Sequence, residues 1–331
     1  MVNYIVSSLT VGVIVGILTL GLNVSWGWVG QLDLAFYGIV AIGAYIGGVM
    51  ELPSSRNSGG STWILGLSLP FPIALIGGMA ASALAALALG SVALRRLRGD
   101  YFAITTVAFA LILTAFLTQQ QSIFNGFEGL YGLQQPFEGV LKLSQSNYQW
   151  FFLGLCIVLL GATYWVLQLL YVSPFGRTLR AIREDETAAA AFGRNAYAQK
   201  LKAYVVGGTC AGMGGVLLAS YVGAWNPSGW AAIETFLLYT AIFLGGQGNS
   251  RGVLLGTLIA LVLIPEITRW LPEIPGHPDL FPAIRNMVDG ALIIGVLWFR
   301  PRGLVPERQP KDREIEQREG QLPALTTAAS Q

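Results

Sequence analysis

Two features of the sequence could do chemistry: a charge-rich stretch, Tyr171–Lys202, and a single aspartate, Asp33, inside an apolar run. An acid buried in a membrane is costly and points by default to function, here to binding a cationic group. The competing interpretation places Asp33 near a helix end, where it caps a membrane span. The charge-rich stretch offers arginines and acids for recognition, although a plain solvated loop has the same composition.

Catalytic and metal-binding patterns are missing from the rest of the chain. His277 is the one histidine, and Cys156 and Cys210 lie in apolar runs without CxxC spacing, so neither a metal centre nor a disulfide is indicated. No Ser/His/Asp set converges in the pattern, and no GxxxxGK[ST] nucleotide loop occurs. We therefore expect no catalytic residue, no metal and no cofactor.

The charge-rich stretch has the composition of a surface helix. Ser173-Pro174 and Gly176 form a turn signal, and Thr178–Phe192 contains neither glycine nor proline. Leu179, Ile182, Glu186 and Ala189 fall at helical spacing and give one weakly apolar face. Gly193 and Asn195 supply a stop. The pattern predicts a short helix that lies on one membrane surface between two spans.

The composition is that of a membrane protein. Of the 331 residues, 53% are hydrophobic and only 11% are charged, with a mean hydropathy of +0.58. Soluble domains are about one quarter charged. A span needs about 20 apolar residues. Runs of that kind occupy residues 4–23, 30–50, 68–92, 101–120, 149–171, 202–222, 232–247, 252–271 and 284–299. The sequence predicts an all-α, polytopic bundle of about 8–10 spans.

Basic residues set the expected orientation. Arg95, Arg96 and Arg98, the charge-rich stretch, Arg251, and Arg300 with Arg302 fall on one side if nine spans begin outside. The other side has only isolated bases. The loop at about residues 172–201 and the C-terminus are therefore expected in the cytoplasm. We expect one transmembrane domain over 1–306 and a disordered charged tail over 307–331.

The second span has an unusual beginning. Gly27 and Gly30 flank Trp28 and Val29 just before the apolar run that holds Asp33. Glycine at this density suggests a broken segment, which a membrane tolerates only where the backbone packs in protein or lines a cavity.

Four segments resemble one known family. They are Gly30-Gln31 with Gly43-Ala44-Tyr45; Arg98–Thr106 (RGDYFAITT); Gly176–Gly193 (GRTLRAIREDETAAAAFG); and Leu244-Gly245-Gly246 with Gly248, followed by Pro301-Arg302-Gly303-Leu304. In this order they resemble the permease subunits of branched-chain-amino-acid-type ABC importers, the LivM/LivH family, and most of all its LivM branch. The likeness runs from about residue 10 to 305.

The resemblance implies a mechanism and partners. Such a subunit is not an enzyme; it pairs with a second permease, two ATPase subunits and a periplasmic binding protein in the bacterial inner membrane. A cytoplasmic helix of the permease sits in a cleft of a separate ATPase subunit, and closure of the ATPases moves this helix and switches the transport pathway between outward-facing and inward-facing. The implied coupling residues are Gly176, Arg177, Arg180, Ala181, Asp185, Glu186, Ala188, Ala189 and Gly193. The implied pathway residues are Gln31, Asp33, Gly43, Tyr45 and Thr105.

Several alternatives stay open from the sequence. Urea and short-amide importers share these motifs, so the amino-acid substrate is an expectation. Many relatives carry a neutral residue where this chain has Asp33, which would favour a cationic group if it reaches the pathway. An ion-coupled secondary transporter would need ion-site residues, and we find no obvious internal repeat. A membrane enzyme would need a catalytic set.

Overall fold

The computed structural model describes nine ranges of the chain. They are residues 2–53, 63, 66–96, 99–133, 135–137, 144–227, 232–269, 280–300 and 303–307. Arg56, Arg98, Lys142, His277, Pro301, Arg302 and residues 308–331 lie outside these ranges, so the disorder expected for the tail is untested.

The described residues are almost entirely helical. In chain order the elements are α1 (Val2–Ser25), α2 (Phe36–Glu51), α3 (Phe71–Arg96), α4 (Gly99–Gln119), α5 (Gln121–Phe124), η2 (Gly126–Glu128), β1 (Leu130–Tyr131), α7 (Gln145–Val172), α8 (Pro174–Glu184), α9 (Glu186–Ala191), α10 (Ala196–Val222), β2 (Ala224–Trp225), α11 (Ala232–Gly245), α12 (Ser250–Thr257), η4 (Leu258–Leu263), α13 (Ile264–Arg269) and α14 (Leu280–Phe299). The two short strands pair antiparallel, Leu130 opposite Trp225.

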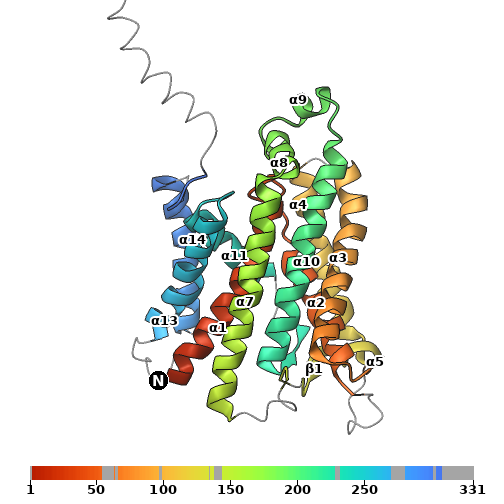
Figure 1. Ribbon diagram of the computed structural model, residues 1–331, viewed down its shortest axis with the longest axis vertical. Helices are drawn as coiled ribbons and strands as arrows, with labels where there is room; N and C mark the ends of the chain where they lie inside the picture. Colours follow the sequence, from red (N-terminus) through yellow and green to blue (C-terminus); the bar gives the residue numbers. More distant parts are fainter. Residues whose placement is uncertain are drawn as a thin grey trace, which may run out of the picture.

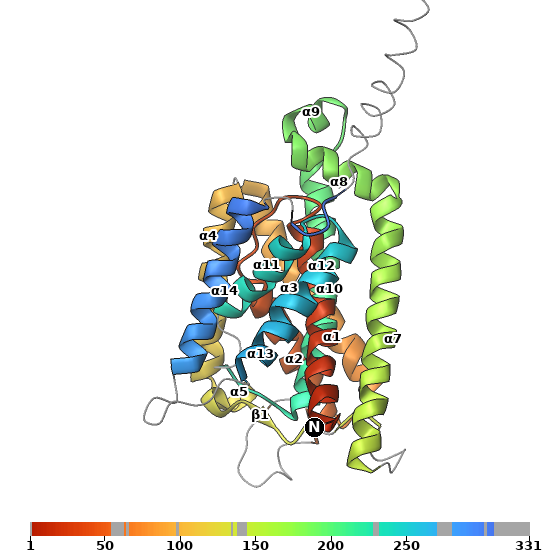
Figure 2. The ribbon, with the colours of Figure 1, turned by 90° about the vertical axis from the view of Figure 1, so that its left-hand side faces the viewer.

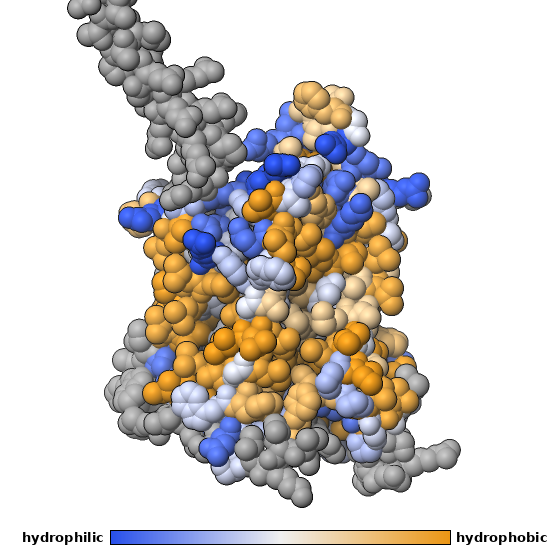
Figure 3. Space-filling view, viewed as in Figure 1, coloured by the Kyte–Doolittle hydropathy of each residue, from blue (hydrophilic) through white to orange (hydrophobic). Residues whose placement is uncertain are grey.

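Each predicted span corresponds to a helix or a helix series, so the predicted fold class is confirmed. Five helices, α1, α3, α4, α7 and α10, are long and apolar enough to cross a membrane, and α2 and α11 are shorter apolar helices. Residues 250–269 form one continuous helical run in which η4 is a π-helical segment. The long helices lie side by side (Figure 1), and on the face that Figure 3 shows, apolar residues cover the middle of the bundle.

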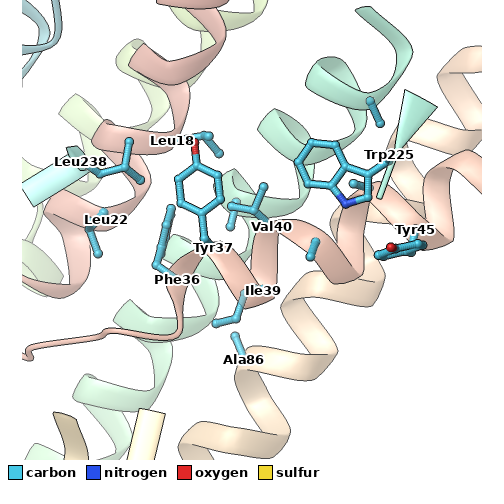
Figure 4. Close-up of a cluster of buried hydrophobic side chains, with 14 of the residues drawn as sticks. Leu18, Leu22, Phe36, Tyr37, Ile39, Val40, Tyr45, Ala86, Trp225 and Leu238 are labelled. Carbon is cyan, nitrogen blue, oxygen red and sulfur yellow. The ribbon is translucent and has the colours of Figure 1, made fainter. Parts of the chain in front are cut away.

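Small residues let the central helices approach closely. α10 packs against α1, α2 and α3. A Cβ added at Gly43 of α2 would lie 2.6 Å from the Cα of Gly212 in α10, and one added at Gly215 would lie 2.3 Å from the carbonyl oxygen of Val40. Backbones in contact at this distance explain why glycine is frequent inside the apolar segments. Large side chains of α1, α2 and α11 fill the core beside these contacts, and α3 contributes the small Ala86 (Figure 4).

The second span begins later than predicted. Residues 26–35 are turns and extended chain, and α2 starts only at Phe36. Trp28 and Asp33 in this segment are fully buried. The expected broken segment is therefore confirmed, and most of its residues are buried in protein, whereas Gly30 is exposed.

The predicted surface helix is wrong in one respect: it is two helices. α8 ends at Glu184, Asp185 is extended, and α9 begins at Glu186. α8 lies across the end of the bundle between α7 and α10, and α9 projects beyond it (Figure 2). The break arises because the Asp185 side chain accepts hydrogen bonds from the Thr187 and Ala188 amides, which starts a new helix at this point.

Candidate functional site

α8 is attached to the bundle through its apolar face. Leu179 is fully buried in the cluster that holds Trp28 and Val29 of the broken segment. Ile182 packs with Ala189 and Ala196, so a second cluster joins α8, α9 and the start of α10. The predicted apolar face is thus correct for Leu179, Ile182 and Ala189, whereas Glu186 is exposed.

The first turn of α8 is pressed against the last turn of α7. A Cβ added at Gly176 would lie 2.3 Å from the Tyr171 carbonyl oxygen. The Arg180 guanidinium lies 4.1 Å from the centre of the Tyr171 ring and donates to the Tyr171 carbonyl oxygen at 3.2 Å. Arg180, which the resemblance assigned to the ATPase, is therefore turned toward α7. A cation over an aromatic face stabilises this corner.

α9 carries its own small network. The Asp185 carboxylate accepts from the Thr187 amide at 2.8 Å and from the Ala188 amide at 3.0 Å. Glu186 and Lys200 form an ion pair at 2.6 Å, which ties α9 to α10. Gly193, at φ +75°, follows α9 in the left-handed region that favours glycine. These contacts fix the direction in which the end of α9 points.

The outward face of this loop combines small and apolar groups. Arg177, Ala181 and Ala188 are exposed, and Phe192 is 86% exposed. Figure 3 shows polar residues around the α8–α9 end and a small apolar cap at its apex. Sequence reasoning did not select Phe192, because its only signal was an aromatic residue next to a helix stop. The predicted coupling residues thus divide into two sets. The outward set is Arg177, Ala181, Ala188 and Gly193. The contacts of the others hold the loop in place, and these are Gly176, Arg180, Asp185, Glu186 and Ala189.

Replacing Asp185 by alanine should loosen α9, whereas asparagine should preserve it, because asparagine keeps an acceptor oxygen. We expect severalfold faster hydrogen exchange over residues 186–192 in Asp185→Ala, and near-unchanged exchange in Asp185→Asn. Equal exchange in both variants would contradict the capping role.

The same cap predicts a pH dependence. The Thr187 hydroxyl and the Ala188 amide donate to the ionised Asp185 and lower its pKa. A lowered folded-state pKa gives a stabilisation that is present above the ordinary pKa and lost as pH falls through the lowered value. The relative exchange rates of the Asp185→Ala variant and the unmodified protein should therefore stay constant from about pH 5 to 8.

Asp33 lies at the centre of a second polar cluster. Its Oδ1 accepts from the Ala35 amide at 3.0 Å, which forms an Asx turn just before α2. The N-cap residue of α2 is Ala35, without a side-chain cap, so the expected capping of the second span by Asp33 is wrong. The Tyr239 hydroxyl accepts from the Asp33 amide at 2.9 Å and donates to the Asp33 carbonyl oxygen at 3.0 Å. The Tyr204 side chain is a hydrogen-bonding neighbour of the Asp33 carboxylate. Asp33 is thus a fully buried acid whose carboxylate meets the Ala35 amide and the Tyr204 side chain just before α2.

The other predicted pathway residues are not gathered around Asp33. Gly43 packs against α10, and the Tyr45 ring is tilted by 48° against Phe124 with ring centres 5.0 Å apart. Thr105 donates within α4 to the Tyr101 carbonyl oxygen at 2.8 Å. Gln31 is buried, and neither of its amide atoms has a partner among the described residues. Their assignment to a pathway stays a prediction.

Comparison with known proteins identifies the family. A family described as "Branched-chain amino acid transport system / permease component" matches residues 4–297. The high-affinity branched-chain amino acid transport system permease protein LivM of Escherichia coli K12 is 30% identical over 316 residues, covering 89% of this chain and 68% of that protein. The high-affinity branched-chain amino acid transport system permease protein LivH of Salmonella typhimurium is 24% identical over 310 residues. This alignment covers 90% of this chain and 93% of that protein.

A probable branched-chain amino acid transport permease protein LivM of Methanocaldococcus jannaschii is 29% identical over 218 residues, which cover 64% of this chain and 62% of that protein. This alignment therefore spans less than two thirds of that relative. No solved structure matches the chain. The family match covers nearly the whole helical bundle together with the α8–α9 loop, and the chain is thereby a member of the permease-component family of branched-chain amino acid transport systems.

Proposed function

We propose that this chain is the membrane-spanning permease subunit of an ATP-driven importer for amino acids, with branched-chain or other neutral amino acids as substrates. The relatives are named as permeases of branched-chain amino acid transport systems, which supports this substrate class. The observation that carries the proposal is the α8–α9 loop, a rigidly attached pair of helices that presents small and aromatic residues beyond the ends of the spans.

The proposed partners are a second permease subunit, two ATPase subunits and a periplasmic substrate-binding protein. The outward set, Arg177, Ala181, Ala188 and Gly193 with Phe192, would enter a cleft of an ATPase, because small residues permit close contact and arginine can pair with acidic groups. Motion of that ATPase would reach the spans through α8.

We place the protein in the bacterial inner membrane with the α8–α9 loop in the cytoplasm. Arg95 at the end of α3, Arg251 at the start of α12 and Arg300 after α14 lie at the same end of the bundle as α8. Basic residues near span ends favour the cytoplasmic side. The C-terminal residues 303–307 lie at this end too, since Leu304 donates to the Leu244 carbonyl oxygen at 2.9 Å.

The test is uptake in proteoliposomes that contain this chain, the second permease and the ATPases, with the binding protein outside. Leucine uptake should require ATP and both ATPases, and Gly193→Val, which strains a left-handed position, should reduce uptake with the complex still assembled. Uptake of urea in place of leucine would shift the proposal to an amide importer. Uptake that follows an ion gradient without ATPases would replace it by a secondary transporter.

A further inference from the structure

One ion pair joins the α8 helix to the C-terminal segment, residues 303–307. Arg183, in the last turn of α8, pairs with Glu307 at 2.6 Å between Nη2 and Oε2, across 124 positions of sequence. A second nitrogen of the same guanidinium donates to the Gly27 carbonyl oxygen in the broken segment after α1. The planar fork of arginine permits both contacts at once, which lysine could not reproduce.

The other oxygen of Glu307 reaches α7. The Tyr171 hydroxyl donates to Glu307 Oε1 at 2.6 Å, so the carboxylate bridges α8 and the end of α7. Charge-assisted hydrogen bonds of this length are stronger than neutral ones. Glu307 thus has both oxygens occupied by groups on two different helices.

The segment that carries Glu307 is hydrogen-bonded to the end of α11. The Leu304 and Val305 amides donate to the Leu244 and Gly245 carbonyl oxygens at the end of α11, each at 2.9 Å. The Asn249 amide group donates to the Val305 carbonyl oxygen at 3.3 Å, next to the start of α12. Because residues 304–305 are hydrogen-bonded to the α11–α12 turn, the ion pair connects that turn to α8.

Gly248 in the α11–α12 turn leaves space for the ion pair. It has φ +83°, and a Cβ there would lie 2.6 Å from Glu307 Oε2 and 3.1 Å from Arg183 Nη1. Gly303 lies against the same turn, where a Cβ added to it would be 2.4 Å from the Cα of Gly246. The closeness of Glu307 and Arg183 gives Gly248 a steric reason.

The pair lies at the edge of water. The Arg183 and Glu307 side chains are 21% and 10% exposed, and a polar cavity of about 350 Å³ beside them is lined by Tyr171, Arg251 and Glu307 among others. A bridge in this position can open and re-form with less desolvation cost than a fully buried one.

We infer that Arg183 and Glu307 are positioning residues that transmit movement of α8 to the α11–α12 half of the bundle through the C-terminal segment. The inference rests on the proposed function, since it is an ATPase that would move α8. The four parts that meet at this bridge, the broken segment after α1, α7, α8 and the α11–α12 turn, cannot shift independently while it is closed. Opening the bridge lets α8 move without the others.

The test measures leucine uptake and ATP hydrolysis together in the complete reconstituted complex. Glu307→Gln and Arg183→Gln should each retain ATP hydrolysis but lower the leucine transported per ATP about fivefold, and the double variant should be no worse than either single one. Gly248→Ala, which displaces Glu307 without removing a charge, should give the same loss. Glu128→Gln, an exposed carboxylate at the opposite end of the bundle, is the control.

Two results would overturn the inference. If uptake per ATP is unchanged in the two single charge variants, the double variant and Gly248→Ala, the bridge transmits nothing. If uptake and hydrolysis fall in proportion, with less complex assembled, the bridge is a static brace. Failure of the proposed function is seen separately, because the unmodified protein would then take up leucine without ATPases.

Discussion

Replacing Phe192 by alanine is expected to lower ATP-driven leucine uptake about 30-fold, the equivalent of about 2 kcal/mol at an interface hot spot. Phe192 is 86% exposed directly after α9, so the bundle loses no packing when the ring is removed. Under the proposed function the ring is buried only when an ATPase cleft encloses it. Buried aromatic anchors carry much of the binding energy of protein interfaces.

The measurement is the affinity of purified ATPase for the permease pair in nanodiscs, followed by uptake in proteoliposomes. Phe127→Ala is the matched control, because Phe127 is 68% exposed in η2 at the opposite end of the bundle. Its removal should change neither affinity nor uptake. Phe192→Leu should restore much of the affinity, since leucine replaces most of the apolar area.

Two outcomes would count against this role of Phe192. Unchanged ATPase affinity in Phe192→Ala would mean that the interface lies on other residues of α8 and α9. An equal loss of ATPase affinity and uptake in Phe127→Ala would mean that removing any exposed aromatic side chain impairs the purified complex. Neither outcome bears on the Arg183–Glu307 bridge, which does not include Phe192.

The spans were predictable from the sequence because a bilayer requires apolar runs of a fixed length. All nine predicted runs have helical counterparts, but the run at 30–50 starts as a helix only at Phe36. Hydropathy does not distinguish helix from a buried extended segment. The glycines before Asp33 carried that information, because non-helical backbone at membrane depth must be enclosed by protein.

The α8–α9 break was not predictable from composition. The four alanines after Thr187 favour one continuous helix, and Asp185 can either stay within a helix or cap a new one. The choice depends on Ile182 and Ala189 packing on Ala196, which is a tertiary contact. Local propensity therefore located the helical segment but not the turn that directs Phe192 outward.

Partners distant in sequence were the least predictable part of the site. The motif at 176–193 includes Arg183, yet nothing in it indicates that the partner is Glu307, a residue that the sequence assigned to a disordered tail. Tyr239 likewise lies inside an apolar run with no sign that it meets Asp33, 206 residues away. Such pairs are set by how helices assemble, and periodicity does not encode them.

Replacing Tyr239 by phenylalanine is expected to destabilise the purified protein by about 3 kcal/mol. The hydroxyl is the partner of both the amide and the carbonyl group of Asp33, and the residue is only 2% exposed. Phenylalanine would keep the ring against Trp26 and Phe243, whose ring centres lie 5.8 and 6.0 Å away. The expected loss of stability therefore comes from the Asp33 amide and carbonyl groups, which would be buried without partners at a cost of about 1–3 kcal/mol each.

Thermal unfolding of the detergent-solubilised protein measures the effect, with Tyr197→Phe as the matched control. The Tyr197 hydroxyl makes one longer bond, 3.3 Å to the Ser91 carbonyl oxygen, at a half-buried position, so water can replace it and the expected loss is below about 1 kcal/mol. If both variants unfold at the same temperature, water must reach Asp33, and its carboxylate then becomes open to solutes that enter with that water. If only Tyr239→Phe is destabilised, Asp33 is held in a dry site, because Tyr239 fixes the backbone from which the carboxylate extends.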